Sequence, residues 1–233
     1  MLIFIGMREF EKEYKNTNYQ IVFYNGYRRL HHNFKGELFC KKHIEYINNY
    51  IPNIGLVSFI INKSDESLDK EVVDFINNSD IKFNYEIILR DNIGFSYGAW
   101  AETIKKNHTK FDYTFIIEDD YIPVEENTLD YFYKKIDDET IYVCCLYVRG
   151  HASISNGMIN TKIMRGNNIN ILESYVGNDY SSDDQTRFMT EYKKYKFKDI
   201  TDVAYTTFHS FAPNKIILYG DKTKKLIIEP ILG

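Results

Sequence analysis

Short apolar runs alternate with helical patterns along most of the chain. Apolar runs of about four to eight residues between polar turns are typical of buried strands, whereas apolar residues three and four positions apart are typical of helices. The predicted strands cover residues 21–24, 56–61, 85–89, 113–117 and 141–146. The segments between them predict helices, the first starting near Glu37 and ending at Pro52. This alternation favours βαβ units and a largely parallel sheet.

The second half of the chain has a less regular pattern. It predicts a strand near residues 159–164, a helix from about Ser182, and short strands near 203–208 and 216–219. The sequence contains no internal repeat and no linker rich in Gly, Pro and Ser. A chain of 233 residues with these features is expected to form one α/β domain.

Composition narrows the classes of partner. The net charge is −4, and basic residues are mixed with acidic ones, so a nucleic-acid partner is not expected. Aromatic residues make up 16% of the chain, which suits a wet binding cleft because a tyrosine both packs and hydrogen-bonds. Tyrosine-rich cores have the same composition, so this feature does not identify a site.

Cysteines and apolar segments indicate the compartment. Cys40, Cys144 and Cys145 match neither a disulfide framework nor a zinc pattern, which favours a reducing setting. No segment reaches the roughly 18 apolar residues of a membrane helix, and the first residues lack the features of a signal peptide. We therefore expect a cytoplasmic protein without a transmembrane segment, and a peripheral membrane contact stays open.

Polar residues follow each of the first four predicted strands. These exits are Asn25-Gly26, residues 62–65, residues 90–92 and residues 118–120. In an open α/β sheet, ligands bind beyond the carboxyl ends of the strands, so these residues are expected to converge on one site. Turns are rich in Asn, Asp and Gly for conformational reasons, so the first two exits also fit ordinary turns.

The fourth exit carries three consecutive acids, Glu118, Asp119 and Asp120. Strand alternation places Glu118 and Asp120 on one face and Asp119 on the other. Crowded carboxylates repel each other unless a cation or hydrogen-bond donors compensate, and oxygen ligands suit Mn²⁺ or Mg²⁺. The alternative is a solvated acidic turn.

At these residues the sequence resembles a known family. Residues 113–124 look like the Asp-X-Asp segment of GT-A glycosyltransferases, in the Glu-Asp-Asp form seen in N-acetylglucosaminyltransferase I type enzymes. Residues 90–100 resemble the Asn-X-Gly loop and following helix of family 2 glycosyltransferases. The resemblance implies a GT-A (Rossmann-like) three-layer α/β/α sandwich, with a mostly parallel central sheet and a smaller mixed C-terminal part. Residues 19–124 would bind the nucleotide sugar, and residues 125–233 would bind the acceptor and supply the base.

The resemblance also assigns roles to residues. The donor site would comprise Tyr24, Asn25, Gly26, Asp65, Arg90, Asn92, Gly94, Tyr97, Gly98, Glu118 and Asp119. Asp120, Glu118 and His209 would hold Mn²⁺ or Mg²⁺. Asp184, with Asp183 as the alternative, would be the catalytic base at the start of a helix, although Ser-Asp at such a position is also ordinary capping. His151 is a candidate for the acceptor pocket.

The expected activity is therefore a metal-dependent, inverting transfer. A sugar would move from a nucleoside-diphosphate donor, preferentially a UDP-sugar, to a hydroxyl group of a glycan or glycoprotein acceptor. Two alternatives stay open, a sugar nucleotidyltransferase and a catalytically degenerate protein that binds a carbohydrate or a partner on the same fold. A glycoside hydrolase is disfavoured because adjacent acids on one strand do not flank a bond from opposite sides.

Overall fold

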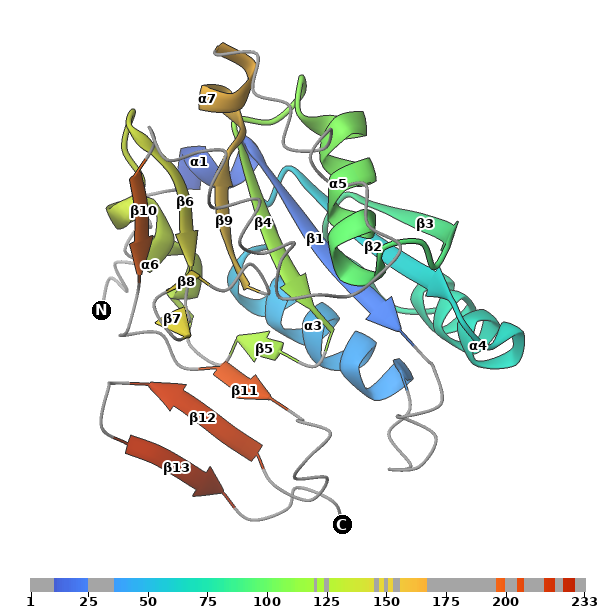
Figure 1. Cartoon of the computed structure of the whole chain (residues 1–233). Coiled ribbons are helices and arrows are strands. Elements are labelled where there is room, and N and C mark those ends of the chain that lie inside the picture. Colours follow the sequence, from blue (N-terminus) through green and yellow to red (C-terminus); the bar gives the residue numbers. More distant parts are fainter. Residues whose placement is uncertain are drawn as a thin grey trace, which may run out of the picture.

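A seven-stranded sheet forms the centre of the molecule, in the order β10-β6-β9-β4-β1-β2-β3 (Figure 1). The computed structural model describes residues 11–24, 36–119, 121–123, 126–144, 147–148, 151–152, 156–166, 196–199, 205–207, 216–220 and 224–228. The strands are β1 Thr17–Tyr24, β2 Leu56–Lys63, β3 Tyr85–Asp91, β4 Tyr113–Glu118, β6 Thr140–Cys144, β9 Asn156–Asn160 and β10 Lys196–Asp199. All are parallel except β9, which pairs antiparallel with β4 and β6. The predicted mostly parallel sheet is confirmed.

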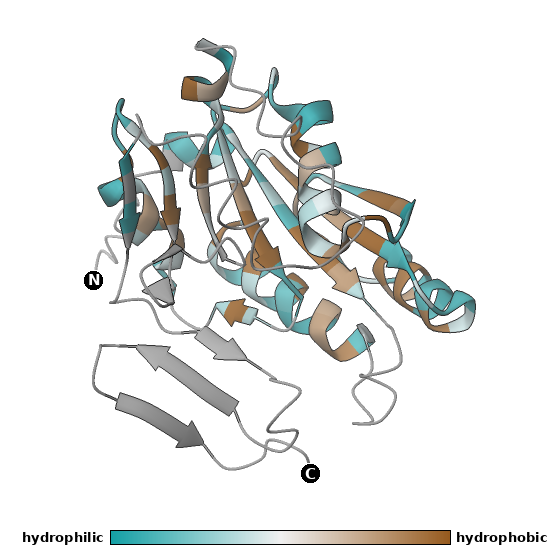
Figure 2. Cartoon of the chain, in the orientation of Figure 1, coloured by the Kyte–Doolittle hydropathy of each residue, from teal (hydrophilic) through white to brown (hydrophobic). Residues whose placement is uncertain are grey.

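Helices cover both faces of this sheet. They are α1 Glu11–Lys15, α3 Gly36–Tyr50, α4 Glu66–Asn77, α5 Phe95–Asn107, α6 Thr128–Lys135 and α7 Thr161–Gly166. Buried side chains of α3, α4 and α6 pack on one face in one apolar cluster, and those of α5 pack on the other face in a second cluster. Figure 2 shows the hydrophobic residues concentrated on the central strands between these layers. The three-layer α/β/α arrangement is therefore as predicted.

A smaller antiparallel sheet lies beside the carboxyl end of β4. Its strands are β5 Tyr121–Pro123, β11 Tyr205–Thr207, β12 Ile216–Gly220 and β13 Lys224–Ile228, in the order β13-β12-β11-β5. A two-stranded ribbon is formed by β7 Tyr147–Val148 and β8 His151–Ala152. Because β5 follows β4 within three residues, the acidic segment joins the two larger sheets.

The structure corrects the prediction of a strand near residues 159–164. There β9 ends at Asn160 and α7 begins at Thr161. The Asn160 side chain accepts a hydrogen bond from the Ile163 amide at 3.1 Å, which is the geometry of a helix N-cap. The apolar residues at 159, 163 and 164 therefore belong partly to a strand and partly to a helix.

Strand β1 begins at Thr17, four residues earlier than predicted. The apolar pattern missed this first half because it is mostly polar, although it is buried. Asn18 donates to Ser58 Oγ at 2.8 Å and accepts from Gln20 at 2.6 Å. Ser58 in turn donates to Glu86 at 2.8 Å, and Asn107 of α5 donates to the same carboxylate oxygen at 2.8 Å. Hydrogen bonding makes such burial tolerable, and a hydropathy pattern does not detect it.

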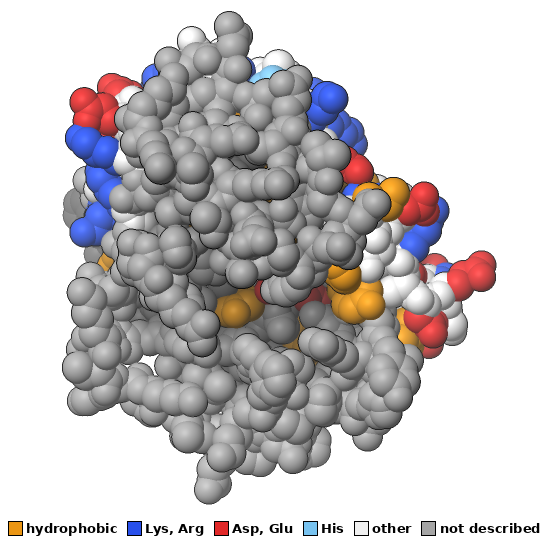
Figure 3. Space-filling model, viewed as in Figure 1, with side chains coloured by type: hydrophobic (Ala, Val, Ile, Leu, Met, Phe, Trp, Pro, Cys, Tyr) orange, Lys and Arg blue, Asp and Glu red, His pale blue; other side chains and the backbone are white. Residues whose placement is uncertain are grey.

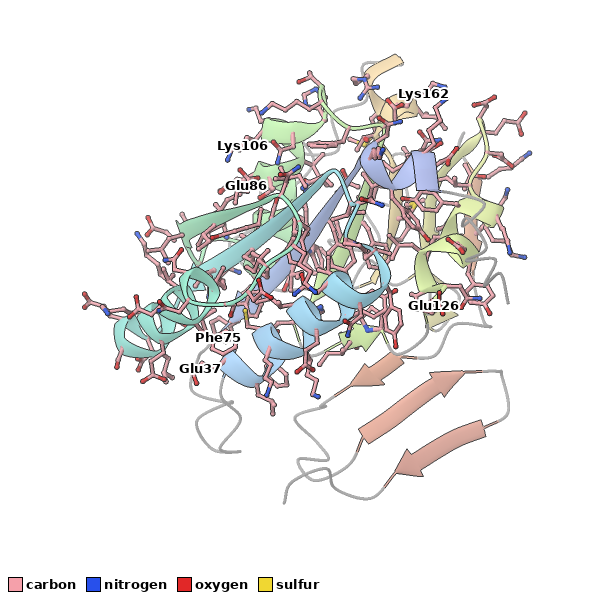
Figure 4. All side chains as sticks on the ribbon, turned by 180° about the vertical axis from the view of Figure 1, so that it is seen from behind. Glu37, Phe75, Glu86, Lys106, Glu126 and Lys162 are labelled. Atoms are coloured by element: carbon pink, nitrogen blue, oxygen red, sulfur yellow. The ribbon has the colours of Figure 1, made fainter. Side chains whose placement is uncertain are left out.

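Glu86 also forms an ion pair with Lys106, the neighbour of Asn107 (Figure 4). The last turn of α5 is therefore bound to the sheet by directional contacts as well as by apolar packing. Elsewhere, positive and negative side chains are mixed along the margins of the described surface (Figure 3). Within the described ranges, no helix is both long and apolar enough to cross a membrane.

Candidate active site

The carboxyl ends of β1, β2, β3 and β4 lie at one edge of the central sheet. The pairing places Tyr24 beside Asn62, Lys63 beside Asp91, and Val22 beside Glu118. The strands are parallel, so their carboxyl ends point in the same direction (Figure 1). This edge therefore brings together the described beginnings of the second, third and fourth exits, whereas Asn25-Gly26 lies outside the described residues.

Glu118 is the last residue of β4 and is half-buried on the face covered by α5. Ser96, in the first turn of α5, donates a hydrogen bond from Oγ to Glu118 Oε1 at 2.9 Å. This contact orients the carboxylate at the point where the strand leaves the sheet. Asp119 lies towards α3 on the opposite face, as the alternation predicted, because burial and then the nearby Asp119 carboxylate raise the pKa of the Cys40 thiol on that helix.

Asp119 is buried, with 1% of its surface exposed. Its amide donates to the Val22 carbonyl at 3.0 Å, and its own carbonyl oxygen lies 3.0 Å from His43 Nε2. Burial lowers the pKa of His43 to about 4, so the ring is neutral at pH 7 and donates from Nε2. The donor-site role predicted for Asp119 stays a prediction, and a direct contact with a donor requires that the carboxylate become accessible.

The loop between β3 and α5 has an unusual backbone. Gly94 has φ 75° and the next residue, Phe95, has φ 51°, so two consecutive residues adopt left-handed conformations. The left-handed region costs a non-glycine residue about 1–2 kcal/mol. The side chains of Ile93 and Phe95 are 60% and 37% exposed. A strained loop that presents apolar side chains at this edge is typical of a functional segment.

Arg90 holds this loop in place. The guanidinium is 7% exposed and donates to Glu102 of α5 at 2.7 and 2.9 Å. It also donates to Asn62 Oδ1 at 2.6 Å and to the Ile93 carbonyl at 2.9 Å. These bonds connect the ends of β2 and β3 to α5. In the structure Arg90 thus supports the loop, and its direct contact with a donor stays a prediction.

Gly98 allows the loop to lie close against α5. A Cβ atom at this position would lie 2.1 Å from the Ile93 carbonyl oxygen. We expect Gly98→Ala to displace the loop and to lower the free energy of unfolding by about 1–3 kcal/mol, as overpacking commonly does. Gly166→Ala is the matched control, because a Cβ there would meet no atom within 4 Å. Urea unfolding of both variants checks this, and equal stabilities would contradict the close approach.

The remaining donor-site candidates lie around the same edge. Asp65 accepts a hydrogen bond from the Leu68 amide at 3.0 Å and so caps α4. A groove of about 610 Å³ beside it is lined by residues that include Lys63, Asp65, Lys70 and Leu89. Tyr24 is half-buried at the end of β1. Tyr97 is also half-buried and packs edge-on against Trp100, with ring centroids 5.7 Å apart.

Several predicted site residues lie outside the described residues. These are Asn25, Gly26, Asp120, Asp183, Asp184 and His209. Of His151 only the backbone, in β8, is described. No group of three His, Cys, Asp or Glu side chains that could hold a metal occurs among the residues that the structure does describe. The roles assigned to the six residues therefore stay predictions.

The described donor atoms at this edge are of the type that a hard divalent cation prefers. Glu118 offers a carboxylate that accepts a hydrogen bond from the Ser96 hydroxyl, and Asn92 has a buried Oδ1 without a hydrogen-bond partner in the described part of the chain. Oxygen atoms of this kind suit Mn²⁺ or Mg²⁺. The residues present fit such an ion in chemical type, and Asp120 lies two residues after Glu118 in the chain.

The structure adds residues that the sequence analysis did not assign. Ser96, Glu102 and Asn62 hold the site residues, and His43 contacts the acidic segment from α3. The helical periodicity indicates that His43 is buried, because it lies on the same face of α3 as Cys40 and Ile47. The other three contacts depend on long-range pairing.

The sequence matches no protein-family model and no curated protein. Solved structures do match. A mannosyltransferase from Pyrobaculum calidifontis, in complex with GDP-Man and Mn²⁺, aligns with a TM-score of 0.56 and 12% identity over 79% of this chain and 54% of that chain. A 4-diphosphocytidyl-2C-methyl-D-erythritol synthase from Anaerococcus prevotii aligns with a TM-score of 0.56 and 10% identity, over 83% of this chain and 89% of that chain. HddC from Yersinia pseudotuberculosis aligns with a TM-score of 0.52 and 11% identity, over 83% of this chain and 93% of that chain.

These likenesses establish the fold. At 10–12% identity they show that the chain adopts the α/β architecture shared with GT-A glycosyltransferases, as the motifs predicted. The chain spans about half the length of the mannosyltransferase that it matches. It spans most of the erythritol synthase, which is a nucleotidyltransferase, so the fold by itself does not separate the two activities.

Proposed function

We propose that the protein is a glycosyltransferase that moves a sugar from a nucleoside-diphosphate donor to a hydroxyl group of a glycan or glycoprotein acceptor. The observation that carries the proposal is the placement of Glu118 and Asp119. Glu118 is oriented by Ser96, and both residues leave the sheet directly before Asp120, next to the Asn92–Gly94 loop. The mannosyltransferase of similar fold was solved with GDP-Man and Mn²⁺, which supports a nucleotide-sugar donor and a divalent ion. A UDP-sugar is our preferred donor.

The proposed mechanism is a single displacement with inversion. Asp120, Glu118 and His209 would hold Mn²⁺ or Mg²⁺, which would stabilise the negative charge that develops on a departing diphosphate. Asp184 would take the proton of the acceptor hydroxyl as its oxygen attacks the anomeric carbon, and Asp183 is the alternative base. Ser96 keeps the Glu118 carboxylate in place, and Arg90 and Gly98 fix the loop beside it. We place the reaction in a reducing compartment, the cytoplasm, where a free thiol such as Cys40 persists.

A sugar nucleotidyltransferase is the second candidate. The fold match to the erythritol synthase, which covers 89% of that chain, favours it. Such an enzyme would join a sugar 1-phosphate to a nucleoside triphosphate and release pyrophosphate. Incubation with both substrates separates the candidates, because pyrophosphate release identifies a nucleotidyltransferase and its absence favours the glycosyltransferase.

A thermal-shift screen tests the proposed donor site. We expect one nucleoside diphosphate or its sugar to stabilise the protein when Mn²⁺ or Mg²⁺ is present. A ligand at a hundred times its dissociation constant adds about 2.7 kcal/mol to the free energy of unfolding. The shift should disappear in Asp120→Ala and persist in Asp130→Asn, an acid on α6 that bonds to Tyr14 far from this edge. A folded sample without a shift for any nucleotide would instead indicate a degenerate binding protein.

A further inference from the structure

His43 reaches from the buried face of α3 to the acidic segment 76 residues later in the chain. Its ring is completely buried, and Nε2 lies 3.0 Å from the carbonyl oxygen of Asp119. The other ring nitrogen, Nδ1, has no hydrogen-bond partner among the described residues. A buried polar ring with one unsatisfied nitrogen is costly, so its single hydrogen bond calls for an explanation.

The carbonyl that His43 contacts lies just beyond the sheet. Pairing of β4 with β1 ends at Glu118, opposite Val22, and pairing with β9 ends at Ile117. The Asp119 amide still bonds to the Val22 carbonyl, but the Asp119 carbonyl has left the ladder. His43 Nε2 lies within hydrogen-bonding distance of this carbonyl and donates to it.

A fixed Asp119 carbonyl also restrains the position of the next residue, Asp120. The peptide unit is planar and contains the Asp119 C=O together with the amide and Cα of Asp120. A hydrogen bond that fixes the direction of the carbonyl therefore also fixes where the Asp120 Cα lies. On the other face of the sheet, Ser96 fixes the Glu118 side chain. The acidic segment is thus held from both helical layers.

We propose that His43 is a positioning residue for the metal and nucleotide site, because it sets the direction in which Asp120 leaves the sheet. The proposal rests on the function proposed above, in which Asp120 ligates the ion. Divalent ions require ligand distances within a few tenths of an ångström, so a rotated Asp119–Asp120 peptide weakens binding. Residues that orient a metal ligand commonly change affinity about 10–100-fold when they are replaced.

Two conservative variants isolate the hydrogen bond. The amide of His43→Gln has an N–H close to the position of Nε2 and reaches the Asp119 carbonyl, whereas the shorter amide of His43→Asn does not. We expect His43→Asn to weaken Mn²⁺ binding at least tenfold in the presence of a nucleoside diphosphate, and His43→Gln to stay within about threefold of the wild type. Electron paramagnetic resonance of free Mn²⁺ measures this affinity without any turnover.

Tyr133→Phe controls for a general loss of stability. It removes a buried hydrogen bond to Thr17 at the opposite end of β1 and should leave Mn²⁺ affinity unchanged. Equal affinities of the asparagine variant, the glutamine variant and the wild type would overturn the positioning role while leaving the proposed function intact. Equal weakening in both variants would also overturn it, since the defect would then be structural. A wild type that binds no Mn²⁺–nucleotide would overturn the proposed function, and this role with it.

Discussion

Replacing Asp184 by asparagine is expected to lower kcat by about 10²–10⁴-fold, the contribution typical of a general base. Asparagine keeps the size and capping ability of the residue but does not take a proton from the acceptor hydroxyl. Donor binding does not involve that proton, so the thermal shift caused by the nucleotide and Mn²⁺ should be unchanged. Turnover is measured as release of nucleoside diphosphate once the screen has identified the donor.

Asp183→Asn is the matched control for this experiment. If Asp184 is the base, the control should stay within a few-fold of the wild-type activity, because asparagine caps a helix about as well as aspartate. The reverse result would move the base to Asp183. Full activity in both variants would exclude a base in this segment. The anomeric configuration of the product tests inversion separately, because retention of the donor's configuration would contradict a single displacement.

Acidification is expected to destabilise the protein through His43. The folded state holds the pKa near 4, whereas an unfolded histidine titrates near 6.5. Between these values the unfolded chain binds the additional proton, so the stability that the neutral ring contributes above pH 6.5 is lost as the pH falls towards 4. At about 1.4 kcal/mol per pKa unit, the loss attributable to this residue is about 3 kcal/mol.

Comparison of variants separates this loss from the titration of carboxyl groups. Urea unfolding at several pH values should show a shallower decline for His43→Gln than for the wild type. Tyr133→Phe, which removes a buried hydrogen bond to Thr17 at the opposite end of β1, should decline like the wild type and controls for a general loss of stability. Parallel curves for the wild type and His43→Gln would show that the buried ring does not titrate differently on folding.

Local patterns predicted the core elements of the sheet because burial there follows hydropathy. The apolar runs that end at Tyr24, in residues 56–61 and in residues 113–117 became β1, β2 and β4. The pattern missed the first residues of β1, since the buried Asn18 bonds to Ser58, far along the chain, and the buried Gln20 bonds in turn to Asn18. No local rule encodes such partners.

The candidate site was predictable in outline for a related reason. Parallel strands deliver their exits to one edge, so Glu118 and the Asn92–Gly94 loop could be placed together from topology alone. The role of Arg90 could not be predicted from topology, because its partners Glu102 and Asn62 belong to different elements. An arginine at a strand end resembles a ligand contact until the acceptors of its hydrogen bonds are located.

Helix α5 is anchored at three levels, and this limits how the site can move. Ser96 bonds to Glu118 at one end, Glu102 bonds to Arg90 in the middle, and Asn107 bonds to Glu86 at the other end, over a length of about 20 Å. Hydrogen bonds are directional, so sliding the helix along its axis would break all three together. The helix and the loop that Arg90 holds beside it would then serve together as a fixed support for a ligand bound at this edge.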